Sequence, residues 1–198
     1  MNNKVVVLSS GGLDSSVLLA HYSNLGYRVY PMYIDYGNAN VSEELEKLLK
    51  VLSKIKGCMP LMETRVDLCW AHSVINTNGG STSDGLYVNM RNLVFIANAV
   101  SYAESVGADL VAVGFINVPA PYRDASPAFL EDINLTIYNA SGIRVEAPLI
   151  HLDKQGVYEL GLKYGIALED TISCNTPVDG KPCGLCDDCM DIRNLKVN

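Results

Sequence analysis

Short apolar runs alternate with longer amphipathic segments along this chain. Runs with the length and composition of buried strands lie at residues 4–8, 28–34, 61–66 and 110–115, and a fifth is expected at 143–147. Segments with the length and apolar spacing of helices lie at residues 14–25, 41–56, 91–106 and about 152–164. Because such alternation is typical of a parallel sheet covered on both faces, we predict a three-layer α/β/α sandwich with about five strands.

The segment 41–56 shows the helical pattern most clearly. Its charged residues lie opposite an apolar face made of Val41, Leu45, Leu48, Leu49, Leu52 and Ile55. Glycines at the expected C-terminal stop follow three of the predicted helices, at Gly26, Gly57 and Gly107. The longest polar stretch, residues 72–90, is expected to form a loop or lid.

Composition narrows the class of protein. The chain has 198 residues, 48% of them apolar, and a formal net charge of −7, which indicates a globular protein with no general face for nucleic acid. No apolar stretch approaches the roughly 18 residues that span a bilayer, and no signal peptide is recognisable. We therefore expect a cytoplasmic protein with neither a nucleic-acid nor a membrane partner.

The turn after the first predicted strand reads SSGGLDSS at residues 9–16. It lies at the carboxyl end of a strand, where open parallel sheets bind ligands. Glycines there let a ligand approach the backbone, and the N–H groups at a helix N-terminus favour an anion. The alternative is an ordinary glycine turn with serine caps.

Four of the six cysteines lie close together near the C-terminus. Their spacing is C-x8-C-x2-C-x2-C, formed by Cys174, Cys183, Cys186 and Cys189. Four thiolates can surround one tetrahedral Zn²⁺ at about 2.3 Å, and a closed sulfur set indicates a structural site. The alternative is a metal-free coil with redox-active pairs. We divide the chain into a main domain, 1–170, and a zinc-binding segment, 171–198, packed on it; Cys58 and Cys69 are expected to be core thiols.

Residues 10–15, SGGLDS, resemble the pyrophosphate loop SGGxDS of the N-type ATP pyrophosphatases, which have an adenine nucleotide alpha hydrolase-like fold. With the cysteine cluster, further segments make the chain similar to the QueC family of 7-cyano-7-deazaguanine synthases. These are DYG at 35–37, the RN-initiated segment 91–109, Tyr122, Asp124, Pro127 and Phe129, and EAPLIHLDKQGVYELGLKYG at 146–165.

The resemblance implies a ligase that uses ATP, Mg²⁺ and Zn²⁺. ATP would adenylate 7-carboxy-7-deazaguanine, and ammonia would displace AMP to give an amide. A second ATP would activate the amide oxygen, whose loss leaves the nitrile. A homodimer is left open.

The resemblance also implies roles for individual residues. The catalytic residues would be Ser10, Asp14, Ser15, Arg91 and Lys154. The nucleotide would contact Leu8, Ser9, Ser10, Gly11, Gly12, Leu13, Asp14, Ser15, Ser16, Asp35, Tyr36, Arg91, Asn92 and Gly114. The acceptor would contact Tyr36, Asn92, Tyr122, Asp124 and Phe129.

Several of these roles have alternatives. Arg91 could be a surface residue instead of a phosphate ligand. Lys154 lies in the first turn of a predicted helix, where a cation is disfavoured, and this placement favours a contact with phosphate. Asp14 could bind Mg²⁺ or hold the loop. Asp124 could bind the deazaguanine amino edge or cap a helix.

The chain departs from the family pattern near the expected acceptor site. Asn89-Met90 replaces Pro-Gly, and smaller or uncharged residues stand at Asn38, Ala39, Asn40, Ala125, Ser126 and Ile172. If these residues line the acceptor pocket, that pocket is less cationic here. Rival functions are an adenylating enzyme with another acceptor or an amide product, a tRNA thiolase using Cys58 or Cys69, and a non-catalytic nucleotide-binding module.

Overall fold

The computed structural model describes residues 3–38, 40–68, 88–118, 122–174, 176–178 and 181–196. Its five strands form one parallel sheet in the order β3-β2-β1-β4-β5. Their bounds are β1 (Lys4–Leu8), β2 (Arg28–Asp35), β3 (Met62–Arg65), β4 (Leu110–Ala112) and β5 (Arg144–Glu146). The parallel five-stranded sheet confirms the predicted fold class.

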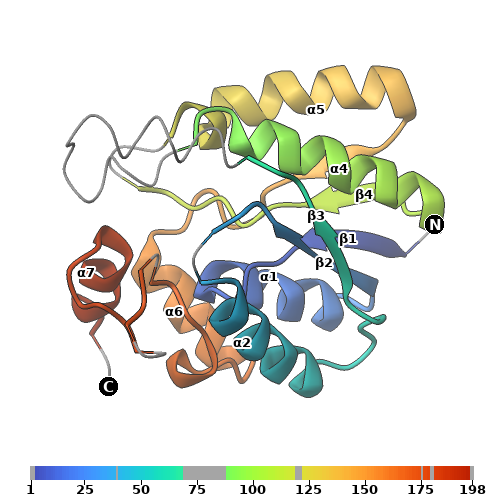
Figure 1. Cartoon of the computed structure of the whole chain (residues 1–198). Coiled ribbons are helices and arrows are strands. Elements are labelled where there is room, and N and C mark those ends of the chain that lie inside the picture. The colour runs from blue at the N-terminus through green and yellow to red at the C-terminus, as the bar shows by residue number, and fades with distance from the viewer. Residues whose placement is uncertain are drawn as a thin grey trace.

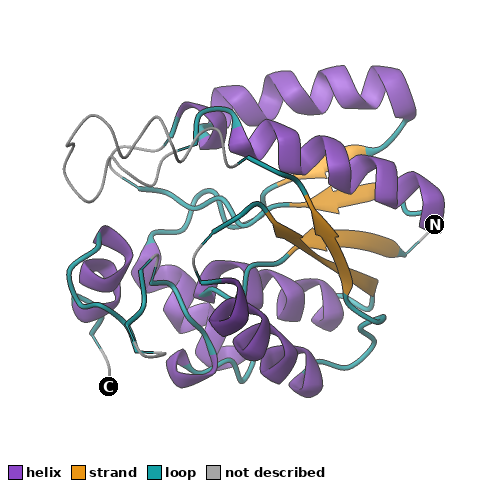
Figure 2. Cartoon of the chain, in the orientation of Figure 1, coloured by secondary structure: helices purple, strands orange, loops and turns teal. Residues whose placement is uncertain are grey.

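Helices cover both faces of the sheet (Figure 1). One face carries α4 (Arg91–Val106) and α5 (Pro127–Ser141), and the other carries α1 (Leu13–Asn24), α2 (Val41–Lys54) and α6 (Lys154–Lys163). Figure 2 shows the strands between these two helical layers. Two short 3-10 helices, η2 (Arg123–Ala125) and η3 (Leu168–Asp170), and the C-terminal α7 (Asp187–Arg193) complete the described elements.

The core follows the two-residue period of β1. Val5 and Val7 pack in the cluster beneath α1, α2 and α6, while Val6 packs with Ala99 and Ala103 of α4. All three valines are fully buried. This alternation holds a helical layer on each face of the central strand.

Some details differ from the sequence expectations. Leu49, placed on the apolar face of α2, is 53% exposed, whereas the neighbouring Leu48 is fully buried. The pattern of apolar positions also does not predict α5 or α7. In α5 the cause is its weak amphipathicity: no residue of this helix is fully buried, and Leu135 and Tyr138 are exposed.

The order of the strands reverses between β1 and β4, which makes this place the topological switch point of the sheet. The chain leaves β1 through α1 to reach β2 on one side, and it returns through α4 to β4 on the other. Open α/β sheets bind ligands at such a point, outside the carboxyl ends of the strands. Within the described residues, no helix is long and apolar enough to cross a membrane.

Candidate active site

A cleft of about 590 Å³ lies at the carboxyl ends of the central strands. It gathers twelve of the predicted catalytic, nucleotide and acceptor residues, from six separate parts of the chain: Leu8, Ser9, Ser10, Gly12, Asp14, Ser15, Tyr36, Arg91, Asn92, Gly114, Tyr122 and Lys154. Gly11, Leu13, Ser16, Asp35, Asp124 and Phe129 do not line it. The fold therefore brings most of the predicted site into one cavity.

The loop before α1 is held by its own serines. The Ser15 hydroxyl donates to the Gly12 carbonyl oxygen at 3.1 Å and accepts from the Ser10 N–H at 3.2 Å. The Ser9 hydroxyl is buried and donates to the Val7 carbonyl oxygen at 2.8 Å, so it supports the turn. Ser10 and Ser15 line the cleft and can turn their hydroxyls to an anion at the N-terminus of α1.

The two glycines of this loop have different environments. Gly11 has a φ of +78°, and a Cβ there would overlap the backbone carbonyl oxygen of Glu44 in α2. Gly12 lines the cleft and has a φ of −74°. Gly11 is thus required by packing, and Gly12 is the glycine that exposes backbone to a ligand.

Asp14 and Lys154 form a closed ion pair on the cleft wall. Lys154 Nζ donates to both carboxylate oxygens of Asp14, at 3.0 and 2.9 Å. The side chain of Lys154 is 12% exposed and that of Asp14 is 25% exposed, so water screens the ion pair only partly. The lysine at the start of α6 is thereby fixed above the first turn of α1.

Arg91 is held against aromatic rings on the opposite wall. Its guanidinium carbon lies 5.2 Å from the ring centroid of Tyr36 and 5.8 Å from that of Phe95. Its Nη1 also donates to the Tyr36 hydroxyl at 3.1 Å. Stacking of this kind orients a planar cation while leaving other N–H groups for an anionic ligand.

Asp124 caps a helix from a distant segment. Its Oδ2 accepts from the Asn92 N–H at 2.9 Å, and the Asn92 side chain donates to the Asp124 carbonyl oxygen at 3.1 Å. The residue is 1% exposed, and its Oδ1 has no hydrogen-bond partner among the described residues. Asp124 therefore positions Asn92 at the start of α4 from behind the cleft.

The other four residues outside the cleft have structural positions, and Leu13 and Ser16 are fully buried in α1. Asp35 accepts from the Gly37 N–H at 2.8 Å and shapes the turn after β2. Phe129 packs with apolar residues between α5 and the sheet.

Glu44 is a cleft residue that the sequence pattern does not single out. Its carboxylate accepts from the Tyr33 hydroxyl at 2.7 Å and from the side-chain amides of Asn38 and Asn40, both at 3.0 Å. Burial raises the pKa of this carboxyl, and the three donors oppose that shift. A half-buried glutamate in a helix rich in surface charge has no distinguishing sequence signal.

The residues that depart from the family pattern are mostly outside the cavity. Asn38 and Asn40 support Glu44, Ser126 caps α5 by accepting from the Phe129 N–H at 3.2 Å, and Ile172 packs with the cysteines. Ala125 lines the cleft, while Ala39 lies outside the described residues, as do residues 72–87 of the predicted loop. Among the described residues, Ala125 is therefore the departure that changes the cleft wall directly.

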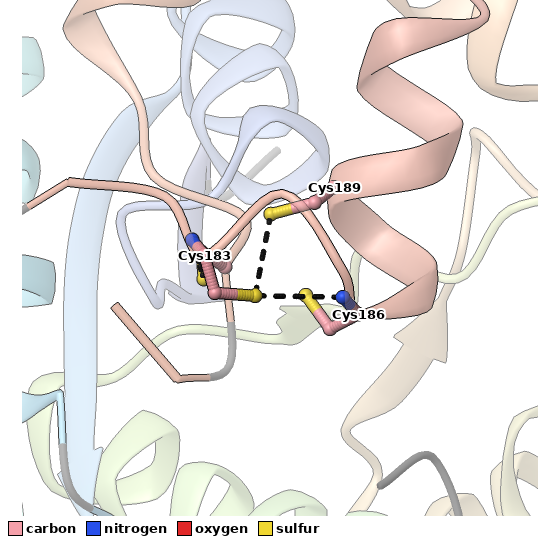
Figure 3. A group of neighbouring side chains, drawn as sticks. Cys183, Cys186 and Cys189 are labelled. Carbon is pink, nitrogen blue, oxygen red and sulfur yellow. Dashed lines mark hydrogen bonds between the residues drawn. The ribbon is translucent and has the colours of Figure 1, made fainter. Parts of the chain in front are cut away.

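The four C-terminal cysteines converge. Their sulfurs all lie within 4.8 Å of one another, and Figure 3 shows three of them pointing to a common centre. Cys183 Sγ is 4.0 Å from Cys189 Sγ, close to the roughly 3.8 Å between sulfurs of a tetrahedral Zn²⁺ site with 2.3 Å bonds. Hydrogen bonds, first that from the Leu185 backbone N–H, lower the pKa of Cys183 to about 6, whereas burial raises the pKa of Cys174 and of Cys189. The donor set fits a thiolate-bound metal.

The cysteine segment also contributes to the cleft. Asp187, Asp188 and Asp191 of α7 line it, facing residues that are far earlier in the chain. Their presence follows from how α7 packs, which the sequence pattern does not predict.

Cys58 lies near the amino ends of the strands, away from the cleft. It forms an isolated backbone β-bridge with Val29, near the amino end of β2, and burial raises the pKa of its thiol to about 11. Cys69 is outside the described residues. Among those described, no cysteine lines the cleft, which disfavours a sulfur relay through Cys58.

Two 7-cyano-7-deazaguanine synthases are similar to the chain over nearly its whole length. A 7-cyano-7-deazaguanine synthase of Anaeromyxobacter sp. (strain Fw109-5) is 32% identical over 94% of this chain and 88% of that protein. One from Thermoplasma acidophilum is 34% identical over 94% of this chain and 84% of that protein.

Solved structures share the fold at low identity. A 4-thiouridine synthetase in complex with RNA and bound ATP superposes with a TM-score of 0.61 at 22% identity, over 91% of this chain and 45% of that one. An NMN synthetase from Francisella tularensis gives a TM-score of 0.55 at 14% identity, over 100% of this chain and 79% of that one. The sequence profile described as queuosine biosynthesis protein QueC matches residues 4–195, so the chain belongs to the QueC family.

Proposed function

We propose that this protein is an ATP-dependent ligase that converts 7-carboxy-7-deazaguanine and ammonia to 7-cyano-7-deazaguanine, the product named in its relatives. The observation that carries the proposal is the meeting of the SGGLDS loop, Arg91 and Lys154 in one cleft. Activation of a carboxylate by ATP needs a phosphate cradle and cations beside an acceptor pocket, and these parts supply both.

The phosphates of ATP are assigned to the loop from Ser10 to Ser15. The N-terminus of α1 supplies the positive end of a helix dipole. Lys154 lies on the same wall, and its charge becomes available to the phosphates once Asp14, its partner in the structure, turns to Mg²⁺. ATP enters as its Mg²⁺ complex, and Asp14 is the carboxylate of the loop that we assign to this ion. Arg91 faces the same space from the opposite wall.

The acceptor is assigned to the side of the cleft near Tyr36, Asn92 and Tyr122. The two tyrosines offer aromatic surface for a planar base, and Tyr122 is 50% exposed at the rim. Asp124 and Phe129 are positioning residues in this arrangement, since both lie behind the wall.

The chemistry divides into two activations. A carboxylate oxygen of the acid attacks the α-phosphorus of ATP and pyrophosphate leaves. Ammonia then attacks the acyl carbon, AMP leaves, and a proton is released to give the amide. The amide oxygen repeats the attack on the α-phosphorus of a second ATP and pyrophosphate leaves. Departure of AMP, which carries that oxygen away, with loss of both N–H protons then leaves the nitrile. One phosphate cradle can serve both activations in turn.

The metal assigned to the four cysteines is Zn²⁺ in a structural role. A closed set of four thiolates leaves no open position for a substrate. Its binding energy would hold residues 171–198, a segment too short to form its own core, against the main domain 1–170.

Mass spectrometry of the products tests the proposal. The protein would be incubated with ATP, Mg²⁺, ammonium and 7-carboxy-7-deazaguanine, and ¹⁵N-ammonium would label any nitrogen that enters. We expect the labelled nitrile. The labelled amide as the sole product would support the rival ligase that stops after one activation, and unchanged acid would contradict both.

A further inference from the structure

The segment 170–174 joins the cysteine cluster to the loop before α1. The Ile172 N–H donates to the Gly11 carbonyl oxygen at 2.9 Å, and the Leu13 N–H donates to the Ser173 hydroxyl at 3.4 Å. The next residue, Cys174, is a member of the cluster. The loop and the metal site are thus linked by backbone that is continuous and hydrogen-bonded at both ends.

Asn40 forms a second link between the two sites. It is 4% exposed, and its side-chain amide donates to the Cys174 carbonyl oxygen and to Glu44 Oε1, both at 3.0 Å. Glu44 lines the cleft, and its backbone carbonyl is the group against which Gly11 packs. Asn40 therefore connects the cysteine backbone to the turn of α2 that supports the loop.

The amino end of this segment is anchored without the metal. Asp170 is paired with Lys50 and Lys54 of α2, and its side chain is 2% exposed. The other end, from Ile172 to Cys174, packs in the cysteine cluster, so a metal there would help to hold it. Loss of the metal would release the part of the segment that touches the loop.

We propose that Asn40, assisted by Ser173, is a positioning residue that couples the cysteine metal site to the phosphate loop. A metal and a nucleotide then each tighten the binding of the other, by the same factor, because linkage between two sites is reciprocal. This inference rests on the proposed ATP site. It goes beyond it by giving the metal an effect on nucleotide affinity in addition to a structural role.

The test measures Zn²⁺ affinity of the full chain by competition with a chromophoric chelator. Measurements are made with and without a saturating non-hydrolysable ATP analogue, at one fixed Mg²⁺ concentration. We expect the analogue to tighten Zn²⁺ binding at least about fivefold in the wild type, the lower end of typical coupling. The effect should fall below about twofold in Asn40→Ala and be reduced in Ser173→Ala.

Asn98→Ala is the matched control. It removes an amide-to-carbonyl hydrogen bond of 2.9 Å, to Val94 within α4, and should keep the full wild-type ratio. A wild-type ratio of one, or a full ratio in Asn40→Ala, would overturn the proposal; if Asn40→Ala does not fold, a full ratio in Ser173→Ala would do so. Calorimetry on the zinc-loaded wild type separates the two proposals, since failure of the analogue to bind contradicts the ATP site itself.

Discussion

Met90 adopts the left-handed backbone conformation immediately before α4, with a φ of +59°. The QueC pattern that the sequence resembles has glycine at this position. A non-glycine residue costs about 1–2 kcal/mol of strain in this conformation. Replacing it with glycine removes the strain, but glycine also raises the entropy of the unfolded chain, which offsets part of the stabilisation. Met90→Gly should therefore raise the free energy of unfolding by about 0.5–1 kcal/mol, as measured by urea denaturation.

Met90→Ala is the control for this prediction. It removes the side chain, which is 39% exposed, but keeps the left-handed Cβ. It should bring no gain in stability. An equal gain from both variants would place the effect in the methionine side chain instead of the backbone.

Gly11 and Gly26 separate backbone strain from steric overlap. Both have positive φ, but a Cβ on Gly11 would meet the Glu44 carbonyl, whereas nothing lies within 4 Å of a Cβ on Gly26. Gly11→Ala should therefore lower the free energy of unfolding by about 1–3 kcal/mol more than Gly26→Ala. Equal losses in chemical denaturation would show that α2 yields to the added methyl group.

Between elements, the pairing of η3 with α2 predicts a pH dependence. The hydrogen bond from Lys54 is the main cause that lowers the pKa of Asp170 from 3.8 to about 2. Because the folded pKa is the lower one, this stabilisation is complete above about pH 4 and is lost as the pH falls toward 2. Asp170→Asn should be roughly 1–2 kcal/mol less stable than the wild type at pH 7.

Denaturation of both proteins between pH 2 and 7 checks this, and their stabilities should converge at the acid end. Arg65→Gln serves as the control, because Arg65 is 65% exposed and its Nε lies as far as 4.0 Å from Asp35 Oδ2, so the ion pair is weak. It should follow the wild-type profile. A constant difference between Asp170→Asn and the wild type at every pH would rule out the ion pairs as its source.

The C-terminal segment should be stabilised by its metal. Cys186→Ser removes one of four converging thiols, so we expect a melting temperature several degrees below that of the zinc-loaded wild type. Chelation should lower the wild-type value in the same way and have little further effect on the variant. Cys58→Ser, which leaves the cluster intact, should keep the response to chelator, and a wild type insensitive to chelation would contradict the metal site.

At the scale of the whole molecule, the fold was predictable because the spacing of apolar residues and the positions of helix-ending glycines agree. Buried strands read as continuous apolar runs, and Gly26, Gly57 and Gly107 all adopt the positive φ of a helix stop. The strand order was not predictable, since it depends on which crossovers pack best. The helix α5 was missed because its apolar residues are only partly buried.

The candidate site was predictable where a local motif carries it. The SGGLDS loop and the four cysteines follow from sequence spacing. The packing role of Gly11 does not, and neither does the identity of α4 as the helix that Asp124 caps. The presence of Glu44 and Asp191 in the cleft does not follow from the sequence either. These features arise from contacts between distant elements, which one sequence does not encode in any short pattern.

The central claim is that this cleft splits ATP between its α and β phosphates to activate the deazaguanine acid. The most direct measurement is chromatography of the nucleotides formed by the wild-type protein with ATP, Mg²⁺ and ammonium, with and without 7-carboxy-7-deazaguanine. We predict that AMP accumulates only with the acid, in a ratio of two AMP for each nitrile because both activations consume ATP. Accumulation of ADP, or AMP formation that is independent of the acid, would contradict the account.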